Sequence, residues 1–474
     1  MLRFIPFLVI AVLALFFAHL AEDSSHNYLW AFSVLGPLTL LGVWDLLQKR
    51  HAVRRNYPII GHLRWLLEEI RPELRQYFFT GDKEETPFDR DQRSLVYQRA
   101  KDVEDKMPFG TKLNVYEKNY SWLNHSMAPR PITEQACRTR VGGPDCKQPY
   151  SASVLNISAM SFGALSGNAI TALNRGAKLG NFAHDTGEGS ISHYHRAGGG
   201  DLIWEIGTGY FGCRNADGSF CVDTFAARAA EDQVRMVEIK LSQGAKPGHG
   251  GILPAAKVTA EIAEARDVPL GEDVISPPAH SAFSTPVGMM EFIAMLREKS
   301  GGKPVGFKLC VGHRWEFLAL CKAMVKTEIT PDFIVVDGSE GGTGAAPLEY
   351  SDHIGTPLID GLTFVQNALI GSGLRGKIRV AASGKVISAF DMVKLMALGA
   401  DWVNAARAFM FAIGCIQSQS CHTNRCPTGV ATQDKRRQTA LDVDDKAQRV
   451  FSYHRNTIHA LTEILSSAGL SSLA

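Results

Sequence analysis

The segment KIRVAASGKVISAFDMVKLMALGADWVNAAR, residues 377–407, decides the fold. Two short apolar runs, 377–383 and 401–407, flank the segment 390–400, whose apolar residues follow a helical period. A strand, a helix and a second strand in this order pair as parallel neighbours, because the helix carries the chain back to the same end of the sheet. The segment therefore predicts one βαβ unit of an α/β protein.

The same pattern repeats along the chain. Eight candidate strands can be counted, at 153–160, 181–186, 236–241, 273–278, 304–311, 332–338, 377–383 and 401–407. Helices are expected between them at 167–180, 251–266, 287–300 and 390–400. Eight such units over about 260 residues predict a (β/α)8 TIM barrel. A doubly wound sheet is the competing topology, but no GxGxxG motif with a downstream acid follows any of these strands.

The composition is that of a globular enzyme. The 474 residues include 50 Lys and Arg, 48 Asp and Glu, and 44 Gly, with a formal net charge of +2. This balance argues against a nucleic-acid partner, since a protein that binds nucleic acid through a basic patch normally carries a cationic excess. Nine cysteines are too few for a disulfide scaffold, so they predict buried thiols or metal ligands.

Two apolar stretches, 4–21 and 28–44, contain no Asp, Glu, Lys or Arg, and each approaches the length of a membrane-spanning helix. Basic residues follow the second stretch, namely Lys49, Arg50, Arg54 and Arg55. By the positive-inside rule, this cluster and the rest of the chain are cytoplasmic. We expect residues 1–50 to form a two-span anchor in the cell inner membrane, in contact with membrane lipid. A cleaved signal peptide at 1–21 is the alternative, and its cleavage site is poor.

Three further regions are expected after the anchor. Residues 51–140 are rich in both charges and predict a juxtamembrane helix followed by a connector. Residues 141–435 contain the repeated strand–helix pattern and would form the barrel, and residues 436–474 would form a C-terminal helical tail.

Glycine and polar residues gather where the predicted strands end, which is where TIM barrels carry their reactive side chains. The run GSEGGTGAAP, 338–347, follows the sixth strand, and consecutive glycines let backbone N–H groups approach an anion closely. Ser383 and Gly384 follow the seventh strand and Arg407 the eighth, where such barrels commonly bind phosphate. The sequence predicts a phosphate-bearing cofactor, with a sugar phosphate substrate as the alternative.

Three cysteines, Cys415, Cys421 and Cys426, lie within twelve residues, and a proline follows the last of them. This spacing suits an iron–sulfur cluster. Zinc would normally require a fourth ligand, which His422 could provide. Three buried structural thiols are the remaining interpretation.

Six motifs occur in one order along the chain. They are NISAMSFGALS (156–166), DTGEGS (185–190), EIKLSQGAKPGHGGILPAAKV (238–258), ISPPAH (275–280), GGTGAAP (341–347) and GCIQSQSCHTNRCPTGVATQ (414–433). Together they closely resemble the FMN-binding synthase domain of glutamate synthase. The resemblance implies a (β/α)8 barrel that holds FMN and a [3Fe-4S] cluster. It also implies an enzyme that reduces 2-iminoglutarate, formed from 2-oxoglutarate and ammonia, to glutamate.

The resemblance also implies roles for single residues. The substrate site would contain Gln243, Lys246, Arg266 and Glu188. The FMN site would contain Met160, Ser161, Lys308, Gly341, Gly342, Ser383, Gly384 and Arg407. The cluster ligands would be Cys415, Cys421 and Cys426. Lys and Arg suit this site because they neutralise a dicarboxylate, and a cation near a flavin stabilises its anionic reduced form.

Two features of the family are missing from the sequence. No cysteine precedes Cys137, so no glutaminase nucleophile is expected near the start, and ammonia would be free or come from a partner amidotransferase. No NAD(P)H-binding motif is found, so electrons would come from a separate donor such as ferredoxin or a reductase subunit. Three segments depart from the family's pattern, 281–288, 381–384 and 404–410.

Two alternatives to a glutamate-forming enzyme remain. One is an FMN and iron–sulfur electron-transfer subunit of a membrane complex, and the other is a reductase of a different imine or 2-oxo acid. Intact Gln243, Lys246 and Arg266 favour an enzyme, since an electron relay needs no site for a dicarboxylate.

Overall fold

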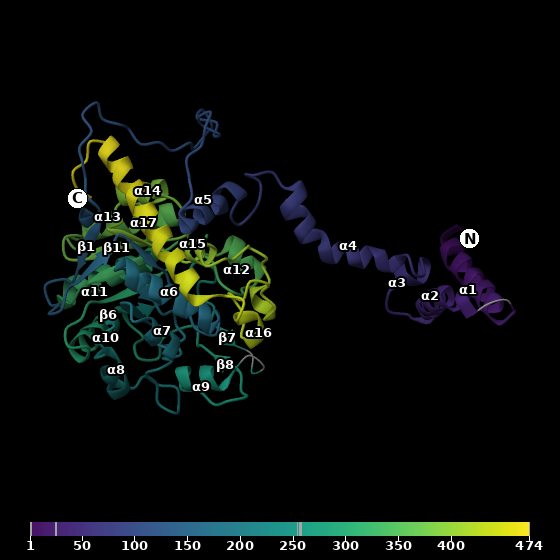
Figure 1. Ribbon diagram of the computed structural model, residues 1–474. Coiled ribbons are helices and arrows are strands. Elements are labelled where there is room, and N and C mark those ends of the chain that lie inside the picture. The colour runs from purple at the N-terminus through teal and green to yellow at the C-terminus, as the bar shows by residue number, and fades with distance from the viewer. Residues whose placement is uncertain (1, 24–25, 254, 256–257, 474) are drawn as a thin grey trace. The chain divides into compact units, whose positions relative to one another are not determined.

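The computed structural model describes residues 2–23, 26–253, 255 and 258–473 (Figure 1). The chain divides into two compact units, Met1–Arg90 and Asp91–Ala474. Parts of three predicted features lie outside the described residues. These are the anchor at residues 1 and 24–25, and the helix 251–266 and the motif 238–258 at residues 254, 256 and 257.

The first unit is helical. Its helices are α1 (Ile5–Asp23), α2 (Leu29–Leu47), α3 (Ala52–Asn56) and α4 (Gly61–Leu74). The first two pack closely, because the ring of Phe7 lies where a side chain at Gly42 would be. Buried Asp45, near the end of α2, accepts hydrogen bonds from Ile59 N at 2.9 Å and from His62 Nε2 at 2.9 Å. These bonds hold the chain that enters α4.

Two stretches of the described chain, Leu2–Asp23 and His26–Leu47, are helices long and apolar enough to cross a membrane, judged by length and composition. Their positions agree with the two apolar stretches expected from the sequence. Helices of this kind occur also in the cores of soluble proteins and in signal sequences.

The second unit contains a closed barrel of eight parallel strands, which confirms the predicted (β/α)8 fold. The strands follow one another around the barrel in chain order, as repeated right-handed βαβ units require. They are β3 (Leu155–Ile157), β4 (His184–Asp185), β5 (Leu202–Ile206), β6 (Val234–Lys240), β9 (Val305–Leu309), β10 (Phe333–Asp337), β11 (Arg379–Ser383) and β12 (Trp402–Ala405). Neighbouring strands are in parallel register, for example Val335 beside Ala381.

One of the eight predicted strands is wrong. The segment 273–278 contributes only β8 (Val274–Ile275), which pairs antiparallel with β7 (Ile252–Leu253) outside the barrel. Its β-branched residues suggested a strand, but two consecutive prolines, Pro277 and Pro278, end it at once and supply no backbone N–H for a ladder.

The missing barrel strand is β5, with the sequence LIWEI. All five of its residues are buried, including Glu205. Like Glu238 of β6, Glu205 is a buried acid within a barrel strand, and it is tolerated because it pairs with Lys308 of β9. The predicted number of strands was right because one omission and one false strand compensated.

Helices surround the barrel. They are α5 (Arg90–Lys101), α6 (Gly167–Gly180), α7 (His193–Gly198), α8 (Val222–Ala229), α9 (Ala260–Arg266), α10 (Pro286–Lys299), α11 (Arg314–Thr327), α12 (Leu348–His353), α13 (Leu358–Gly371), α14 (Ala389–Ala397), α15 (Arg407–Ala412), α16 (Lys435–Gln438) and α17 (Val443–Ser467). The long helix α17, yellow in Figure 1, packs along α6 and also contacts α14. The helix expected at 251–266 is shorter, since α9 begins only after Thr259, whose hydroxyl accepts a hydrogen bond from Ile262 N.

A two-stranded hairpin precedes the barrel. It pairs β1 (Arg138–Val141) with β2 (Tyr150–Ser153) in antiparallel register. Gly143, in the turn of this hairpin, donates a 2.6 Å hydrogen bond to the carboxylate of Asp332, which directly precedes β10. The hairpin is thereby joined to the end of the barrel at which β10 begins, opposite to the end where the strand-end loops lie.

Candidate active site

A pocket lies where β6 ends, among loops at the carboxyl end of the barrel. Glu188, Lys240, Gln243 and Lys246 line it, together with Thr208, Leu241, Ser242, Gly248, His249, Gly250, Gly251, Pro277 and Pro278. The structure thus brings together three of the residues expected in a substrate site, Glu188, Gln243 and Lys246. The pocket combines two ammonium groups, one carboxylate and one amide.

Glu188 forms an ion pair with Lys240, whose Nζ lies 3.0 Å from Glu188 Oε2. Burial opposes ionisation of Glu188, but Lys240, Lys246 and Arg266 outweigh it and lower the pKa of Glu188 to about 2. Glu188 is therefore a carboxylate at neutral pH. Burial also lowers the pKa of Lys246, although the charge of Glu188 counteracts this effect.

The loop after β6 is fixed by two neighbouring strands. Gly244 N donates a 2.7 Å hydrogen bond to Asp337 Oδ2 at the end of β10. Ser242 Oγ accepts a 2.9 Å hydrogen bond from Cys310 N, which directly follows β9. The backbone of Gly244 also runs so close to Gly338 that a side chain would overlap it. These contacts position Gln243 and Lys246 on either side of a rigid turn.

Arg266 lies at the end of α9 and does not line the pocket. It is 7% exposed, donates a 3.3 Å hydrogen bond to the carbonyl of Phe162, and its guanidinium carbon lies 5.2 Å from the centre of the Phe211 ring. Burial lowers the pKa of Arg266, and Glu188 opposes this shift. Arg266 therefore acts on the pocket through its charge on Glu188 and through the loop after β3.

Met160 and Ser161 lie in that loop. Met160 N donates a 3.4 Å hydrogen bond to the carbonyl of Asp185, and Gly187 packs against the backbone N of Ser161. Ser158, just after β3, lies with its hydroxyl 3.4 Å from the hydroxyl of Ser383. This loop therefore connects the pocket with the strand ends that carry the predicted phosphate site.

The five residues expected to hold a phosphate gather at the ends of β10, β11 and β12. Gly338 N donates to the carbonyl of Ser383 at 2.8 Å, and Arg407 donates to the carbonyl of Glu340 at 2.6 Å. Gly341 is held by a 2.8 Å hydrogen bond to Gly338 O. Arg407 Nε lies 2.9 Å from the position that a side chain at the neighbouring Gly342 would take. Gly384 follows Ser383 directly at the end of β11.

Lys385 adds a second cation beside Arg407. Burial lowers the pKa of Arg407 to about 10, although Asp337 and Glu340 counteract the shift. Burial and the charge of Arg407 both lower the pKa of Lys385. A half-buried Arg407 and an exposed Lys385 beside glycine backbone form a favourable site for a phosphate group, so these residues fit the phosphate of FMN.

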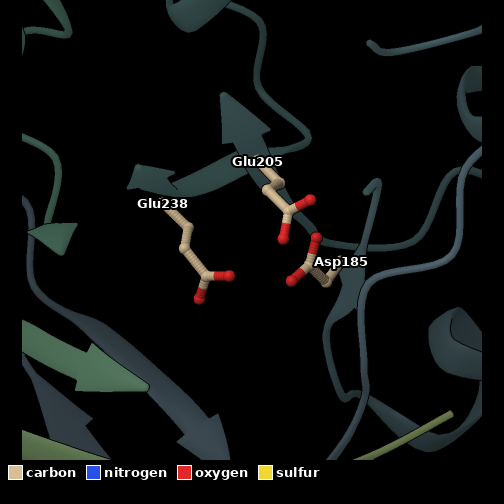
Figure 2. A group of neighbouring side chains, drawn as sticks. All are labelled: Asp185, Glu205 and Glu238. Carbon is tan, nitrogen blue, oxygen red and sulfur yellow. The ribbon is translucent and has the colours of Figure 1, made fainter. Parts of the chain in front are cut away.

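Lys308 points into the barrel interior and is 4% exposed. Its ammonium contacts Glu205 and lies 3.5 Å from Glu238 Oε1. Figure 2 shows the acidic side chains Asp185, Glu205 and Glu238, which converge on one point. Lys308 is therefore paired with acidic groups, a surrounding that its sequence position did not reveal.

Cys415, Cys421 and Cys426 lie in the segment that follows α15, and they are thiols rather than members of a disulfide. Burial raises the pKa of Cys415 to about 12, and the charges of Cys421 and Cys426 act in the same direction. Burial acts against the Cys426 thiolate, but N–H groups of residues 428, 430 and 431 and the hydroxyl of Thr428 lower its pKa. Gln417 N lies 3.5 Å from Cys415 Sγ, and the hydroxyl of Thr428 lies 3.5 Å from Cys426 Sγ. Three cysteine sulfurs in one short segment are the donor set that an iron–sulfur cluster requires.

The cysteine segment is joined to the loop after β3. Gln433 Nε2 donates hydrogen bonds to the carbonyls of Gly163 and Leu165 at 3.1 and 2.9 Å. Val430 O accepts a 2.8 Å hydrogen bond from Ser166 N. The three thiols therefore belong to the same end of the barrel as the pocket.

Three site residues were missed by the sequence analysis. Lys240 could have been found, because it is the last residue of β6 and therefore lies at the strand end, where barrels carry their reactive side chains. Lys385 directly follows the predicted Ser383–Gly384 pair and could have been added as a basic residue of the phosphate site. Glu205 could not be found, because it lies on the strand that was not predicted.

The family model that matches this chain and two proteins similar to it in sequence all carry the name glutamate synthase. A family described as the conserved region in glutamate synthase matches residues 133–471. The glutamate synthase large subunit-like protein YerD of Bacillus subtilis is 38% identical over an alignment of 469 positions that covers 90% of this chain and 89% of that protein. The archaeal-type NADPH glutamate synthase of Thermotoga neapolitana is 34% identical over 317 residues, 67% of this chain. The chain spans only 59% of the length of that protein.

Two solved structures match the chain at low similarity. A crystal structure of mandelate oxidase has a TM-score of 0.44 and 16% identity, and covers 74% of this chain and 83% of its own. A lactate oxidase of Pediococcus acidilactici has a TM-score of 0.42 and 13% identity, and the match covers 73% of this chain and 80% of the oxidase chain.

Proposed function

Because the chain belongs to the glutamate synthase family, we propose that it is an oxidoreductase that reduces 2-iminoglutarate to glutamate. The imine would form from 2-oxoglutarate and ammonia, which is free or supplied by a partner amidotransferase. The electrons would come from a separate donor, such as ferredoxin or a reductase subunit. FMN and a [3Fe-4S] cluster are the proposed cofactors.

The pocket between Glu188 and Lys246 is the observation that carries this proposal. Lys240 and Lys246 bring two positive charges and Glu188 one negative charge, while Gln243 adds an amide. The net positive charge suits an anionic substrate, and ammonium groups make strong charge-assisted hydrogen bonds with carboxylates. An electron relay would need no such pocket.

Each polar residue of the pocket would contact a different part of the substrate. Lys246 would hold a carboxylate of the substrate, and Gln243 would hydrogen-bond its polar atoms. Glu188 stays ionised because Lys240, Lys246 and Arg266 lower its pKa, so it would attract the positively charged, protonated imine nitrogen. Arg266 would be a positioning residue, since its hydrogen bond to Phe162 orders the loop that contains Met160 and Ser161.

Gly341, Gly342, Ser383, Gly384, Lys385 and Arg407 would hold the phosphate of FMN. Met160 and Ser161 would lie against its ring, and Cys415, Cys421 and Cys426 would hold the cluster. Bound FMN supplies hydride transfer and accepts single electrons from an iron–sulfur cluster. Lys308 would act on the flavin through its charge from inside the barrel.

We further propose that residues 1–50 anchor the enzyme in the cell inner membrane and that the barrel lies in the cytoplasm. The two apolar helices support this arrangement by length and composition, and basic residues follow the second of them. The four regions expected from the sequence, 1–50, 51–140, 141–435 and 436–474, remain the proposed domain division.

Anaerobic reoxidation tests the proposed reaction. The purified protein is reduced, then mixed with 2-oxoglutarate plus ammonia and, in parallel, with other 2-oxo acids plus ammonia. We expect rapid reoxidation of the flavin with 2-oxoglutarate only when ammonia is present. A faster reaction with another 2-oxo acid would identify a different imine reductase. Reoxidation by none of them, but by an artificial electron acceptor, would favour an electron-transfer subunit.

A further inference from the structure

Three acidic side chains meet inside the barrel. Asp185, Glu205 and Glu238 come from the adjacent strands β4, β5 and β6, and their carboxyl groups point toward one another (Figure 2). One oxygen from each lies within 4.8 Å of the other two, and the three residues are at most 1% exposed. Buried like charges at this distance repel strongly unless cations or protons neutralise them.

Lys308 of β9 supplies opposite charge to this group. Its ammonium contacts Glu205 and lies 3.5 Å from Glu238 Oε1, and the charge of Asp337 on β10 also acts on it. One ammonium therefore contacts carboxyl groups from two strands, β5 and β6. Lys308 can neutralise one of the three converging carboxylates, which leaves negative charge to be compensated.

The hydrogen bonds of the three acids show which carboxylate charge lacks a donor. Asp185 Oδ1 accepts a 2.9 Å hydrogen bond from Gly187 N. Neither oxygen of Glu238 has a hydrogen-bond donor among the described residues, although the side chain is fully buried and aimed at the group. A protonated carboxyl group is itself a donor, so one proton turns a repulsive contact between two carboxylates into a hydrogen bond.

Burial and charge favour the same protonation state. Burial and the charge of Glu205 raise the pKa of Asp185 to about 7. Burial and the charge of Asp185 raise the pKa of Glu238 well above its ordinary value. Burial acts against the charge of Lys308, but the acidic groups around it raise its pKa. The protons are therefore held by the carboxyl groups while Lys308 stays an ammonium.

We propose that Asp185, Glu205, Glu238 and Lys308 form a buried proton store, in which the carboxyl groups share at least one exchangeable proton at neutral pH. A divalent metal ion is the competing ligand for three carboxylates. The ammonium of Lys308 already contacts two members of the group, Glu205 and Glu238, so a divalent cation would have to bind against its positive charge. The three carboxyl groups therefore hold a proton and not a metal ion.

The use of this proton rests on the proposed function. Reduction of a C=N bond to an amine takes up two electrons and two protons, and a donor of single electrons brings no proton. A protonated imine carries one of these protons into the pocket, and the other must come from water through the protein. Asp185 lies three residues before Glu188, and Glu238 lies two residues before Lys240, so two strands lead from the store to the pocket. The store gives a proton toward the pocket and regains one from water.

Infrared spectroscopy of the full chain tests the store without substrate or turnover. We expect the carbonyl stretch of a protonated carboxylic acid at pH 7, with the shift in D2O that marks an exchangeable proton. Glu238→Gln should remove or shift this band. Asp332→Asn is the matched control, because Asp332 is equally buried but pairs with Arg297 at 3.0 Å and accepts two backbone N–H bonds. That variant should keep the band.

Two results would overturn the proposal. One is the absence of a protonated carboxyl band in the wild-type protein at pH 7, a result that needs no variant to fold. The other is calorimetric binding of Mg²⁺ or Mn²⁺ that Glu238→Gln abolishes, which would make the group a metal site. Neither measurement involves 2-oxoglutarate. A protein that fails to reduce 2-iminoglutarate could therefore still show the protonated carboxyl group, and a protein without this group could still form glutamate.

The role in reduction has its own readout. When the wild-type protein is reduced in weakly buffered solution, it should take up more protons per pair of electrons than Glu238→Gln does. Asp332→Asn should match the wild type. Equal proton uptake in all three proteins would show that the group is not used as a store during reduction and would overturn that part of the proposal.

Discussion

Replacing Lys246 with methionine should weaken the binding of the 2-oxo acid and leave the cofactors in place. Lys246 lines the pocket beside Glu188, and burial lowers the pKa of its ammonium, so its charge is partly removed from water. A hydrogen bond from a charged group of this kind is worth about 1.5–3 kcal/mol. At about 1.4 kcal/mol per tenfold change, its loss raises the KM for 2-oxoglutarate about ten- to a hundredfold.

The assay is steady-state glutamate formation at saturating ammonia and a fixed concentration of reduced donor, with 2-oxoglutarate varied. Lys178→Met is the matched control, since Lys178 is exposed in the last turn of α6. Flavin content should be the same in both variants and in the wild type. An unchanged KM in Lys246→Met, or an equal increase in the control, would refute the assignment of Lys246 to substrate binding.

The remaining predictions concern the cofactors, the buried acids and the anchor. Cys421→Ser should lose the iron–sulfur signal in electron paramagnetic resonance but keep the flavin absorbance, and retention of the full signal would contradict the ligand assignment. Arg407→Met should weaken FMN binding at least tenfold in a fluorescence titration of the apoprotein, because one of two phosphate-binding cations is lost, and unchanged affinity would count against the site. Folding raises the pKa of Asp185 from 3.8 to about 7, so this group destabilises the folded state increasingly as the pH rises through that window. Asp185→Asn should therefore lose less stability than the wild type between pH 5 and pH 8, by roughly 1–4 kcal/mol in urea unfolding, whereas an identical pH dependence would mean that Asp185 is ionised throughout. Deleting residues 1–50 should move the protein from the membrane fraction to the soluble fraction without loss of flavin, and an unchanged distribution would argue against the anchor.

The barrel was predictable because seven of its strands show plain sequence patterns. Strands such as β10, with the sequence FIVVD, are short, apolar and followed by glycine, and helices of clear periodicity separate them. The strand β5, with the sequence LIWEI, was missed, and its glutamate does not explain the omission, because β6 was predicted although it contains the equally buried Glu238. The false strand at 273–278 shows the opposite case, in which β-branched residues are followed by two prolines.

The site could be predicted in part for the same reason. Motif order placed Glu188, Gln243 and Lys246 at neighbouring strand ends, and they line one pocket. The surroundings of Lys308 could not be foreseen, because its partner Glu205 lies on the missed strand. The position of Arg266 could not be predicted from the sequence. Its guanidinium packs over the ring of Phe211 and does not line the pocket.

The most direct test of imine reduction follows nitrogen and electrons together. The anaerobically reduced protein is mixed with 2-oxoglutarate and ¹⁵N-labelled ammonia, and the product is analysed by mass spectrometry while the electrons lost from the protein are counted. Imine reduction predicts one ¹⁵N-labelled glutamate for every two electrons. Loss of electrons without labelled glutamate, in a preparation that contains both flavin and cluster, would contradict the assignment.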